Sequence, residues 1–432
     1  MQLVDIYKIY LSHPKISTDT RKIESGSIFL ALKGANFNGN EFADKALELG
    51  AAYAIVDEEK YKTNERIILV QDVLKTLQEL ARYHRDQLNI PVIGITGTNG
   101  KTTTKELIYS VLKEKYHCFA TQGNLNNHIG VPLSILSIDK KVEIAVIEMG
   151  ANHIGEIAFL CSIAKPSYGL ITNVGRAHLE GFGSYEGVKK AKGELYTWLS
   201  EHQGTLFIQQ DNQELKGMAE TLHFKERIGY GYSEDATVSG KLVENNPFLR
   251  LKWIFKGQEN TVSTQLTGAY NTENILAAIC IGSFFGLTVQ EINQGVAGYQ
   301  PQNNRSQILK TDCNTLICDY YNANVSSMKA ALENLQSIQT GLTKVAILGD
   351  MFELGDDSSE EHKKLIDEAL AVSNLKCIFI GRAFAEHQSG KALFFETTDA
   401  AAEWIRQNPL RDKLILLKAS RGMTFEKLID VL

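Results

Sequence analysis

The sequence predicts an α/β protein divided into three segments, as its length, its composition and the order of its apolar stretches indicate. The chain has 432 residues, too many for one ordinary core, and its 44% hydrophobic content is too high for a disordered chain. Apolar stretches typical of buried strands alternate with helical stretches, which favours parallel sheets covered by helices on both faces. We expect three domains, over residues 1–88, 89–299 and 300–432.

The first segment contains the short apolar stretches SIFLAL, YAIVD and IILV, with helical stretches between them. It ends in DVLKTLQELARYHRDQL, where the spacing of apolar residues predicts a helix with one buried face. Asp72 stands at the position of an N-cap for that helix. We therefore expect a small α/β domain here.

The second segment has four buried-type strands, PVIGIT, EIAVIEMG, YGLITNV and GTLFIQQD, which alternate with helices. This pattern predicts a mostly parallel sheet. The later stretch ATVSGKLVENNPFLRLKWIFKGQENTVSTQL alternates apolar and polar residues around ENNP and KGQEN. It predicts an antiparallel hairpin appended to that sheet.

The third segment repeats the alternation of strands and helices with KVAILGD, KCIFIG, ALFFE and KLILLKAS. A second, smaller α/β domain explains this pattern most simply.

Composition excludes several classes of protein. The net charge of −6 argues against a general nucleic-acid binder, so an anionic ligand must be held by local groups. Six cysteines without a C-x-x-C pair favour buried thiols in a reducing compartment over disulfides or a zinc site. No stretch reaches the roughly 18 apolar residues of a membrane span. We expect a soluble cytoplasmic protein with no membrane insertion and no nucleic-acid partner.

The stretch GITGTNGKTTTKELI predicts an anion site between a strand and a helix. With the strand ending at Thr96 and the helix beginning near Thr102, free backbone N–H groups and a helix N-terminus point to one place. Lys101 adds a positive charge, and the hydroxyl of Thr102 suits Mg²⁺. These features favour ATP or GTP binding.

The glycines in this stretch depart from the common phosphate-loop pattern, which places four residues between them. Gly94 and Gly100 enclose five residues, and Gly97 and Gly100 enclose two. The competing interpretation is a glycine turn with a solvated lysine, but a Gly-Lys-Thr at a strand-to-helix junction makes nucleotide binding the better hypothesis.

The variant loop GTNGKTT resembles the nucleotide loop of the Mur ligase family, the ATP-dependent amide-forming enzymes of peptidoglycan synthesis. The segments GNLNNHIGVP, IEMGANHIGEI, AHLEGFGSYEGVKKAKGE, YNANVSSM and LGDMFELG extend the resemblance over nearly the full length. The resemblance implies a UDP-substrate-binding domain over residues 1–88. It further implies a central ATP-binding domain over residues 89–299 and a Rossmann-like domain over residues 300–432 that binds a dipeptide.

The substrates implied by the resemblance are ATP, UDP-N-acetylmuramoyl-tripeptide and D-alanyl-D-alanine. ATP would phosphorylate the terminal carboxylate of the tripeptide, and the dipeptide amine would attack the acyl phosphate. The alternatives within this class are another Mur ligase or a folylpolyglutamate synthase. From a different class, a nucleotide-dependent switch would share the loop but would have no use for a UDP-binding domain. We also expect a monomer.

The resemblance implies nucleotide contacts in two domains. Taken alone, Asn271 and Asn274 are more often helix caps than adenine contacts, and the approach QNNR to Arg305 departs from the usual family pattern. The residues expected to bind ATP are Gly97, Thr98, Asn99, Gly100, Lys101, Thr102, Thr103, Asn271, Asn274, Arg305 and Asp319.

Metal binding is expected at the end of the strand EIAVIE and in the loop after the next strand. The residues implied to hold Mg²⁺ are Thr102, Glu148, His178 and Lys192, the lysine as a carbamate, and together with Lys101 the last three form the expected catalytic set. Read alone, His178 is more often a hydrogen-bonded loop residue. Nothing in the spacing of Lys189, Lys190 and Lys192 selects one of these lysines from a solvated helix face.

The remaining expected contacts follow from the resemblance alone. For the UDP substrate they are Thr18, Asp19, Thr20, Arg21, Asn126 and Asn127, and for the dipeptide they are Asn322, Asn324 and Asp350. A surface salt bridge would explain Arg21 nearly as well, and polar turns would explain the dipeptide set. The usual Asp-Gly-His of the first domain is replaced by Asn38-Gly39-Asn40.

Overall fold

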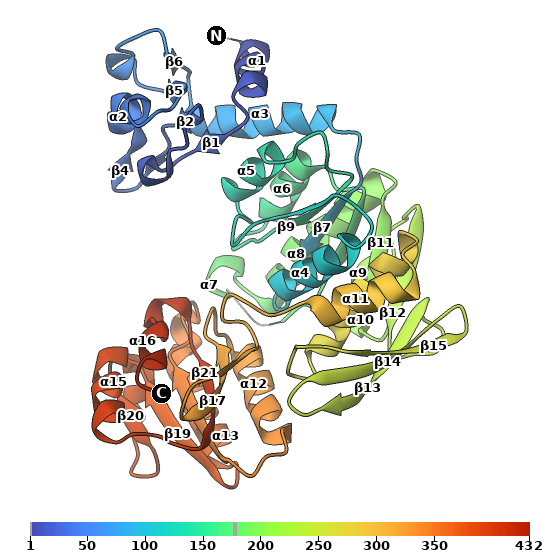
Figure 1. Cartoon of the computed structure of the whole chain (residues 1–432), viewed down its shortest axis with the longest axis vertical. Coiled ribbons are helices and arrows are strands. Elements are labelled where there is room, and N and C mark those ends of the chain that lie inside the picture. The colour runs from blue at the N-terminus through green and yellow to red at the C-terminus, as the bar shows by residue number, and fades with distance from the viewer. Residues whose placement is uncertain (1, 176–178) are drawn as a thin grey trace.

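The computed structural model describes residues 2–175 and 179–432 (Figure 1). Its strands form three larger sheets, within residues 16–69, 92–263 and 307–418. Two further short strands pair as a hairpin. This mixed architecture confirms the predicted α/β class. Within the described ranges, no helix is long and apolar enough to cross a membrane.

The first sheet is parallel, with strand order β1-β2-β5-β6. Asp72 caps the last helix as predicted, because its side chain accepts a hydrogen bond from the backbone N–H of Lys75 at 2.8 Å. The elements are α1 (Leu3–Ser12), β1 (Ile16–Ser17), β2 (Ile28–Leu30), β3 (Lys33–Gly34), β4 (Phe37–Asn38), α2 (Ala43–Glu48), β5 (Tyr53–Val56), β6 (Ile67–Leu69) and α3 (Val73–Gln87).

The variant tripeptide Asn38-Gly39-Asn40 has a structural role. Asn40 is fully buried, donates a hydrogen bond to the carboxylate of Asp57 and accepts one from its backbone N–H, both at 2.9 Å. The side chain of Asn38 accepts a hydrogen bond from the backbone of Asn40. Together they fix the turn after β4 to the end of β5.

The central sheet has nine strands in the order β15-β14-β13-β12-β11-β10-β7-β9-β8. Strands β8 to β13 pair in parallel, and β13, β14 and β15 are antiparallel. The predicted hairpin is therefore present, and a third strand extends it. The strands are β7 (Val92–Thr96), β8 (Cys118–Ala120), β9 (Ile144–Glu148), β10 (Tyr168–Ile171), β11 (Thr205–Gln209), β12 (Glu226–Gly231), β13 (Val238–Asn245), β14 (Leu249–Phe255) and β15 (Gln258–Ser263).

Helices cover both faces of the parallel part of this sheet, which is why β7, β9 and β11 are buried along their whole length. Ala145 and Ile147 of β9 face a core formed with α5, α6 and α8, whereas Ile144 and Val146 face α4, α10 and α11. The first core also takes in α1 and α3. The helices are α4 (Lys101–Leu112), α5 (Gly130–Leu136), α6 (Glu156–Ala164), α7 (Leu179–Phe182), α8 (Tyr185–Glu201), α9 (Gln213–Ala219), α10 (Asn271–Phe284) and α11 (Val289–Gly298).

The third sheet has the order β16-β17-β21-β18-β19-β20, and only the pair β16–β17 is antiparallel. It lies below the central domain in Figure 1, with α12 facing β13. The elements are β16 (Gln307–Lys310), β17 (Asn314–Asp319), α12 (Val325–Ser337), β18 (Thr343–Gly349), α13 (Ser358–Leu370), β19 (Leu375–Ile380), α14 (Arg382–Ala385), β20 (Leu393–Phe395), α15 (Thr398–Gln407), β21 (Lys413–Lys418) and α16 (Glu426–Ile429).

Candidate active site

A cavity of about 760 Å³ lies between the central and C-terminal domains. It is lined by the glycine-rich loop after β7, by the carboxyl end of β9, by the first turn of α10 and by the segment after β17. The carboxyl ends of parallel strands are where open α/β sheets bind ligands. The cavity is therefore the candidate active site.

The loop adopts a conformation that two of its glycines make possible. Gly97 and Gly100 have φ values of 144° and 78°, in the region that favours glycine. A Cβ atom on Gly97 would lie 2.1 Å from the hydroxyl of Thr172, and one on Gly100 would lie 2.8 Å from the side chain of Asn274. Helix α4 then begins at Lys101 without a side-chain cap, so its first N–H groups remain free to bind an anion.

Lys101 is held inside the loop. Its ammonium donates hydrogen bonds to the carbonyls of Gly97 at 2.7 Å and Thr98 at 2.9 Å. Burial lowers the pKa of Lys101 to about 8; the charge of Glu148 opposes this shift, and that of Arg305 adds to it. The ammonium thus pairs with neutral carbonyls, which leaves it available to phosphate oxygens.

Glu148 presents a partly unsatisfied carboxylate at the end of β9. One oxygen accepts hydrogen bonds from the hydroxyl of Thr102 at 3.2 Å and from the amide of Asn126 at 2.9 Å. The other oxygen is buried and has no hydrogen-bond partner among the described residues, although the ammonium of Lys105 lies 3.7 Å away.

A hydroxyl beside an orphaned carboxylate oxygen fits Mg²⁺, which prefers oxygen ligands and keeps several waters. In the ranges 2–175 and 179–432, no group of three or more His, Cys, Asp or Glu residues could hold a metal ion. That finding is compatible with a metal bound mainly by water and phosphate. The expected ligand His178 lies outside the described residues.

Burial singles out Lys192 from its neighbours. Its side chain is 3% exposed, donates a hydrogen bond to the carbonyl of Ala151 at 3.2 Å and lies 5.0 Å from the ring centroid of Phe182. Burial, reinforced by the charge of Lys101, lowers the pKa of Lys192 to about 7. By contrast, Lys189 forms ion pairs with two glutamates and Lys190 is exposed.

Asn271 and Asn274 connect the start of α4, directly after the glycine-rich loop, to α10 through hydrogen bonds. The hydroxyl of Thr104 donates to Asn274 at 3.0 Å, Asn274 donates to Asn271 at 2.9 Å, and Asn271 donates to the carbonyl of Thr267 at 2.8 Å. Both asparagines line the cavity. Neither caps α10, whose N-cap position is Tyr270 without a capping side chain.

Asp319 and Arg305 approach the same cavity from the C-terminal domain. Asp319 accepts a hydrogen bond from the backbone of Ser306 at 3.2 Å and pairs with the ammonium of Lys418 at 3.0 Å. The guanidinium of Arg305 lies 3.8 Å from the ring centroid of Tyr321, and its Nε is buried with no hydrogen-bond partner within residues 2–175 and 179–432. A donor in that state suits an oxygen of a bound nucleotide.

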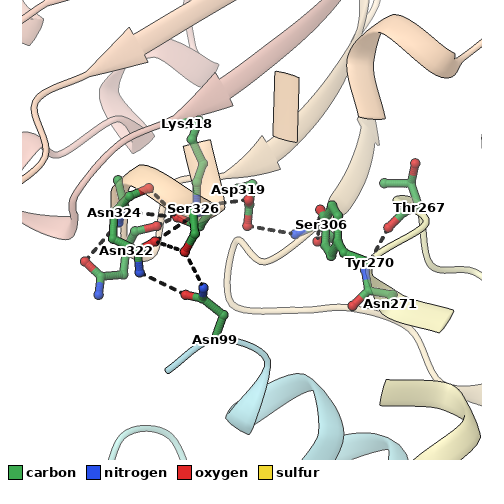
Figure 2. A network of polar contacts seen from close by, with 12 residues as sticks. Asn99, Thr267, Tyr270, Asn271, Ser306, Asp319, Asn322, Asn324, Ser326 and Lys418 are labelled. Carbon is green, nitrogen blue, oxygen red and sulfur yellow. Dashed lines mark hydrogen bonds and ion pairs between the residues drawn. The ribbon is translucent and has the colours of Figure 1, made fainter. Parts of the chain in front are cut away.

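The loop also contacts the C-terminal domain directly (Figure 2). The side chain of Asn99 donates to the hydroxyl of Ser326 at 2.8 Å and accepts a hydrogen bond from the side chain of Asn324 at 2.9 Å. Asn324 is the N-cap of α12. In Figure 2 the two parts of the site therefore meet through these three side chains.

Other expected residues have local partners. Arg21 forms an ion pair with Asp19 at 2.8 Å, and its side chain is 87% exposed. This surface salt bridge is the alternative noted above, and neither residue lines the cavity. Asn126 and Asn127 do line it, and the side chain of Asn127 also accepts hydrogen bonds from backbone N–H groups at the start of α5.

Asp350 does not line the cavity. Its carboxylate accepts hydrogen bonds from the backbone N–H groups of Ala383 and Phe384 at 3.1 Å, which gives it a structural role at the start of α14. The alternative of a polar turn residue fits it better than dipeptide contact does. Asn322, in contrast, lines the cavity.

Sequence reasoning missed several residues of the site. Ser326 contacts the loop, Lys418 pairs with Asp319, and Lys105 is 2% exposed beside Glu148. Of these three residues, only Lys105 could have been found from the sequence, because it lies one helical turn after Lys101 on a helix that the spacing of apolar residues predicts. The partners of the other two come from distant parts of the chain.

The fold and the site define a nucleotide-dependent enzyme whose active site lies between two α/β domains. Three protein-family models match stretches of this chain. They are "Mur ligase family, catalytic domain" over residues 15–85, "Mur ligase middle domain" over 95–282, and "Mur ligase, glutamate ligase domain" over 304–421. The chain belongs to the Mur ligase family. It is an ATP-dependent ligase, so the alternative of a nucleotide switch is wrong.

Relatives match over the full length. The chain is 35% identical to the UDP-N-acetylmuramoyl-tripeptide–D-alanyl-D-alanine ligase of Bacillus subtilis, covering 96% of this chain and 92% of the relative. It resembles a crystal structure of MurF from Acinetobacter baumannii with a TM-score of 0.85 and 31% identity, over 96% and 92% of the two chains. The crystal structure of MurF ligase from Thermotoga maritima in complex with ADP has a TM-score of 0.84 and 28% sequence identity, over 96% of each chain.

Proposed function

We propose that the protein joins D-alanyl-D-alanine to UDP-N-acetylmuramoyl-tripeptide with the conversion of ATP to ADP and phosphate, in peptidoglycan precursor synthesis. The single observation that carries the proposal is the cavity shared by the glycine-rich loop and by Arg305 and Asp319 of the C-terminal domain. The full-length similarity to ligases of this name supports the choice of substrates.

The reaction has two steps. A terminal carboxylate oxygen of the tripeptide attacks the γ-phosphorus of ATP, the bond to ADP breaks, and an acyl phosphate forms. The dipeptide amine then attacks the acyl carbon, loses a proton and expels phosphate, which leaves an amide. Both steps gather negative charge, so positioning and electrostatic stabilisation supply most of the catalysis.

The chain's own groups suit that task. The free N–H groups of α4 and the ammonium of Lys101 surround the place expected for the phosphates. Thr102 and Glu148 would hold Mg²⁺, which supplies further positive charge when bound. Asn271 and Asn274 keep the loop in shape, and Arg305 offers its unpaired Nε to the nucleotide.

Lys192 is proposed to work as a carbamate. The buried amine lines the cavity and has no acidic hydrogen-bond partner in the part of the chain that the structure describes, and its low pKa favours the neutral form that reacts with CO₂. Carbamylation would convert a cation into an oxygen ligand in the cavity that Glu148 also lines, where a hard metal needs one. His178 is proposed as a further ligand from the family resemblance.

The outer domains are assigned to the other substrates. Residues 1–88 are proposed to bind the UDP moiety through Thr18, Asp19, Thr20 and Arg21, with Asn126 and Asn127 nearer the reacting end. Residues 300–432 are proposed to bind the dipeptide, with Asn322 and Asn324 at the cavity. We also propose a monomer that acts in the cytoplasm, where such nucleotide-linked substrates are soluble.

Phosphate release should depend on both acceptor substrates. We expect slow release with ATP and either UDP-N-acetylmuramoyl-tripeptide or D-alanyl-D-alanine alone, and fast release with both, because the acyl phosphate is consumed only by the amine. A coupled phosphate assay measures this. Single amino acids in place of the dipeptide serve as the control for other ligases of the family. Hydrolysis that is equal in all arms would contradict the proposal.

A further inference from the structure

The proposed dipeptide substrate carries a positively charged amine at one end and a carboxylate at the other. The residues expected to bind it do not fully complement either charge. Its amine must reach the acyl phosphate, but its carboxylate stays behind in the C-terminal domain. The three residues expected to bind it are two asparagines and an aspartate, and an aspartate repels a carboxylate. A cation is therefore missing from the expected set.

The lysines that line the cavity have other partners, and the arginine is assigned to the nucleotide. Lys418 pairs with Asp319 and donates to the carbonyl of Asn322 at 2.6 Å. Lys101 lies within the glycine-rich loop, and Lys192 lies beside it in the central domain. Arg305 belongs to the nucleotide side of the site. The carboxylate needs a cation at the outer rim of the C-terminal domain.

Arg421 is not itself among the residues that line the cavity, but it lies beside one of them, Tyr321. It begins the turn Arg421–Met423, which two residues separate from the end of β21, and its guanidinium lies 5.0 Å from the ring centroid of Tyr321, which lines the cavity. Arg421 is exposed, and within the described part of the chain it forms no ion pair with an acidic side chain. A planar guanidinium lying over an aromatic ring keeps its N–H groups available at the edge.

The turn that carries Arg421 is held in place by its neighbours. The backbone N–H of Ser420 donates to the carbonyl of Asp350 at 3.3 Å, and the hydroxyl of Ser420 accepts from the N–H of Phe352 at 3.0 Å. The ring of Phe352 lies so close to Gly422 that a Cβ there would be 2.7 Å from it. The backbone is thus fixed while the guanidinium has no acidic partner, which reduces the ordering cost of binding.

We propose that Arg421 binds the C-terminal carboxylate of the dipeptide. The inference rests on the proposed function and adds the residue that selects a free carboxylate. Arg421 follows β21 at the carboxyl edge of the sheet, where such sheets bind ligands. Two parallel N–H···O bonds from the guanidinium would fix the dipeptide end, and its amine then points into the cavity. This role also fits Asp350, which supports the turn through its backbone carbonyl.

Kinetics of Arg421→Gln test the proposal on the protein side. We expect the KM for D-alanyl-D-alanine to rise about 10- to 100-fold, the loss typical of a hydrogen bond to a charged group, while the KM for ATP changes little. Arg382→Gln is the matched control, because Arg382 is also exposed at this edge, has no acidic partner in the described residues and does not line the cavity. Melting temperatures verify that both variants fold.

The carboxyl amide of D-alanyl-D-alanine tests the same contact from the substrate side. The wild type should use the amide about 10- to 100-fold less well than the acid, and Arg421→Gln should use both nearly alike. If the variant still prefers the acid as strongly as the wild type does, or if Arg382→Gln weakens dipeptide binding equally, the assignment is wrong. A wild type that uses neither compound overturns the proposed function itself.

Discussion

Replacement of Lys192 by alanine is expected to lower turnover by roughly 10²-fold or more, as for the loss of a preorganised charged group at the reacting centre. The residue is 3% exposed and lines the same cavity as Glu148, so the variant removes the oxygen ligand that its carbamate would offer there. Steady-state phosphate release with both acceptors measures the loss.

Two neighbours on the same helix provide the controls. Lys189→Ala and Lys190→Ala should keep nearly full activity, because these side chains lie in surface ion pairs or in solvent. A small carboxylate such as acetate should partly restore Lys192→Ala by occupying the vacated ligand position. Mass spectrometry under CO₂-replete, non-acidic conditions should detect the carbamate. If all three lysine variants behave alike and the side chain is unmodified, the idea is refuted.

Replacement of Lys101 by alanine should lower turnover by roughly 10²–10³-fold, a cost of about 3–4 kcal/mol by analogy with removing one preorganised donor. The ammonium sits within the loop on the carbonyls of Gly97 and Thr98, where it can turn to a phosphate that gains charge in the transition state. Stopped-flow or steady-state phosphate release with saturating substrates gives the turnover.

Lys113→Ala is the matched control for this variant. Lys113 follows the last residue of the same helix, is exposed, and lies at the end remote from the loop. It should therefore leave turnover unchanged, and thermal melts of both variants should match the wild type. A loss of less than about threefold in Lys101→Ala would mean that the loop does not hold the transferring phosphoryl group.

Local pattern was sufficient to predict the fold class and the loop. The strand before the loop ends at Thr96 as expected, and α4 begins at Lys101, one residue before the predicted start. The strand end and the helix start both follow from the spacing of residues over a short stretch of sequence. The hairpin after residue 237 was also predicted from alternation, although its third strand was not.

Contacts between distant segments could not be predicted in this way. Nothing near Asn274 in the sequence indicates that it lies under Gly100, and nothing near Asn99 indicates Asn324. Burial selects Lys192 among three lysines only after α8 packs on the sheet. These properties depend on tertiary packing, so residue type and spacing carry no information about them.

The family resemblance supplied roles that the residues alone left open, and the structure separates these roles. Glu148 and Thr102 lie together as a metal site requires. Asp350 instead binds backbone N–H groups away from the cavity, because the same polar turn can serve as a helix cap or as a ligand contact. Only the position of its carboxylate decides between the two.

The most direct test of the proposed reaction follows oxygen atoms. UDP-N-acetylmuramoyl-tripeptide is labelled with heavy oxygen in both positions of its terminal carboxylate and is incubated with ATP, Mg²⁺ and D-alanyl-D-alanine. The acyl-phosphate route predicts that, for each amide formed, one labelled oxygen leaves in phosphate and the other stays in the amide carbonyl. Mass spectrometry of phosphate and product measures both. Unlabelled phosphate, or ATP hydrolysis without a UDP-linked pentapeptide, would contradict the assignment of this chain as the dipeptide ligase.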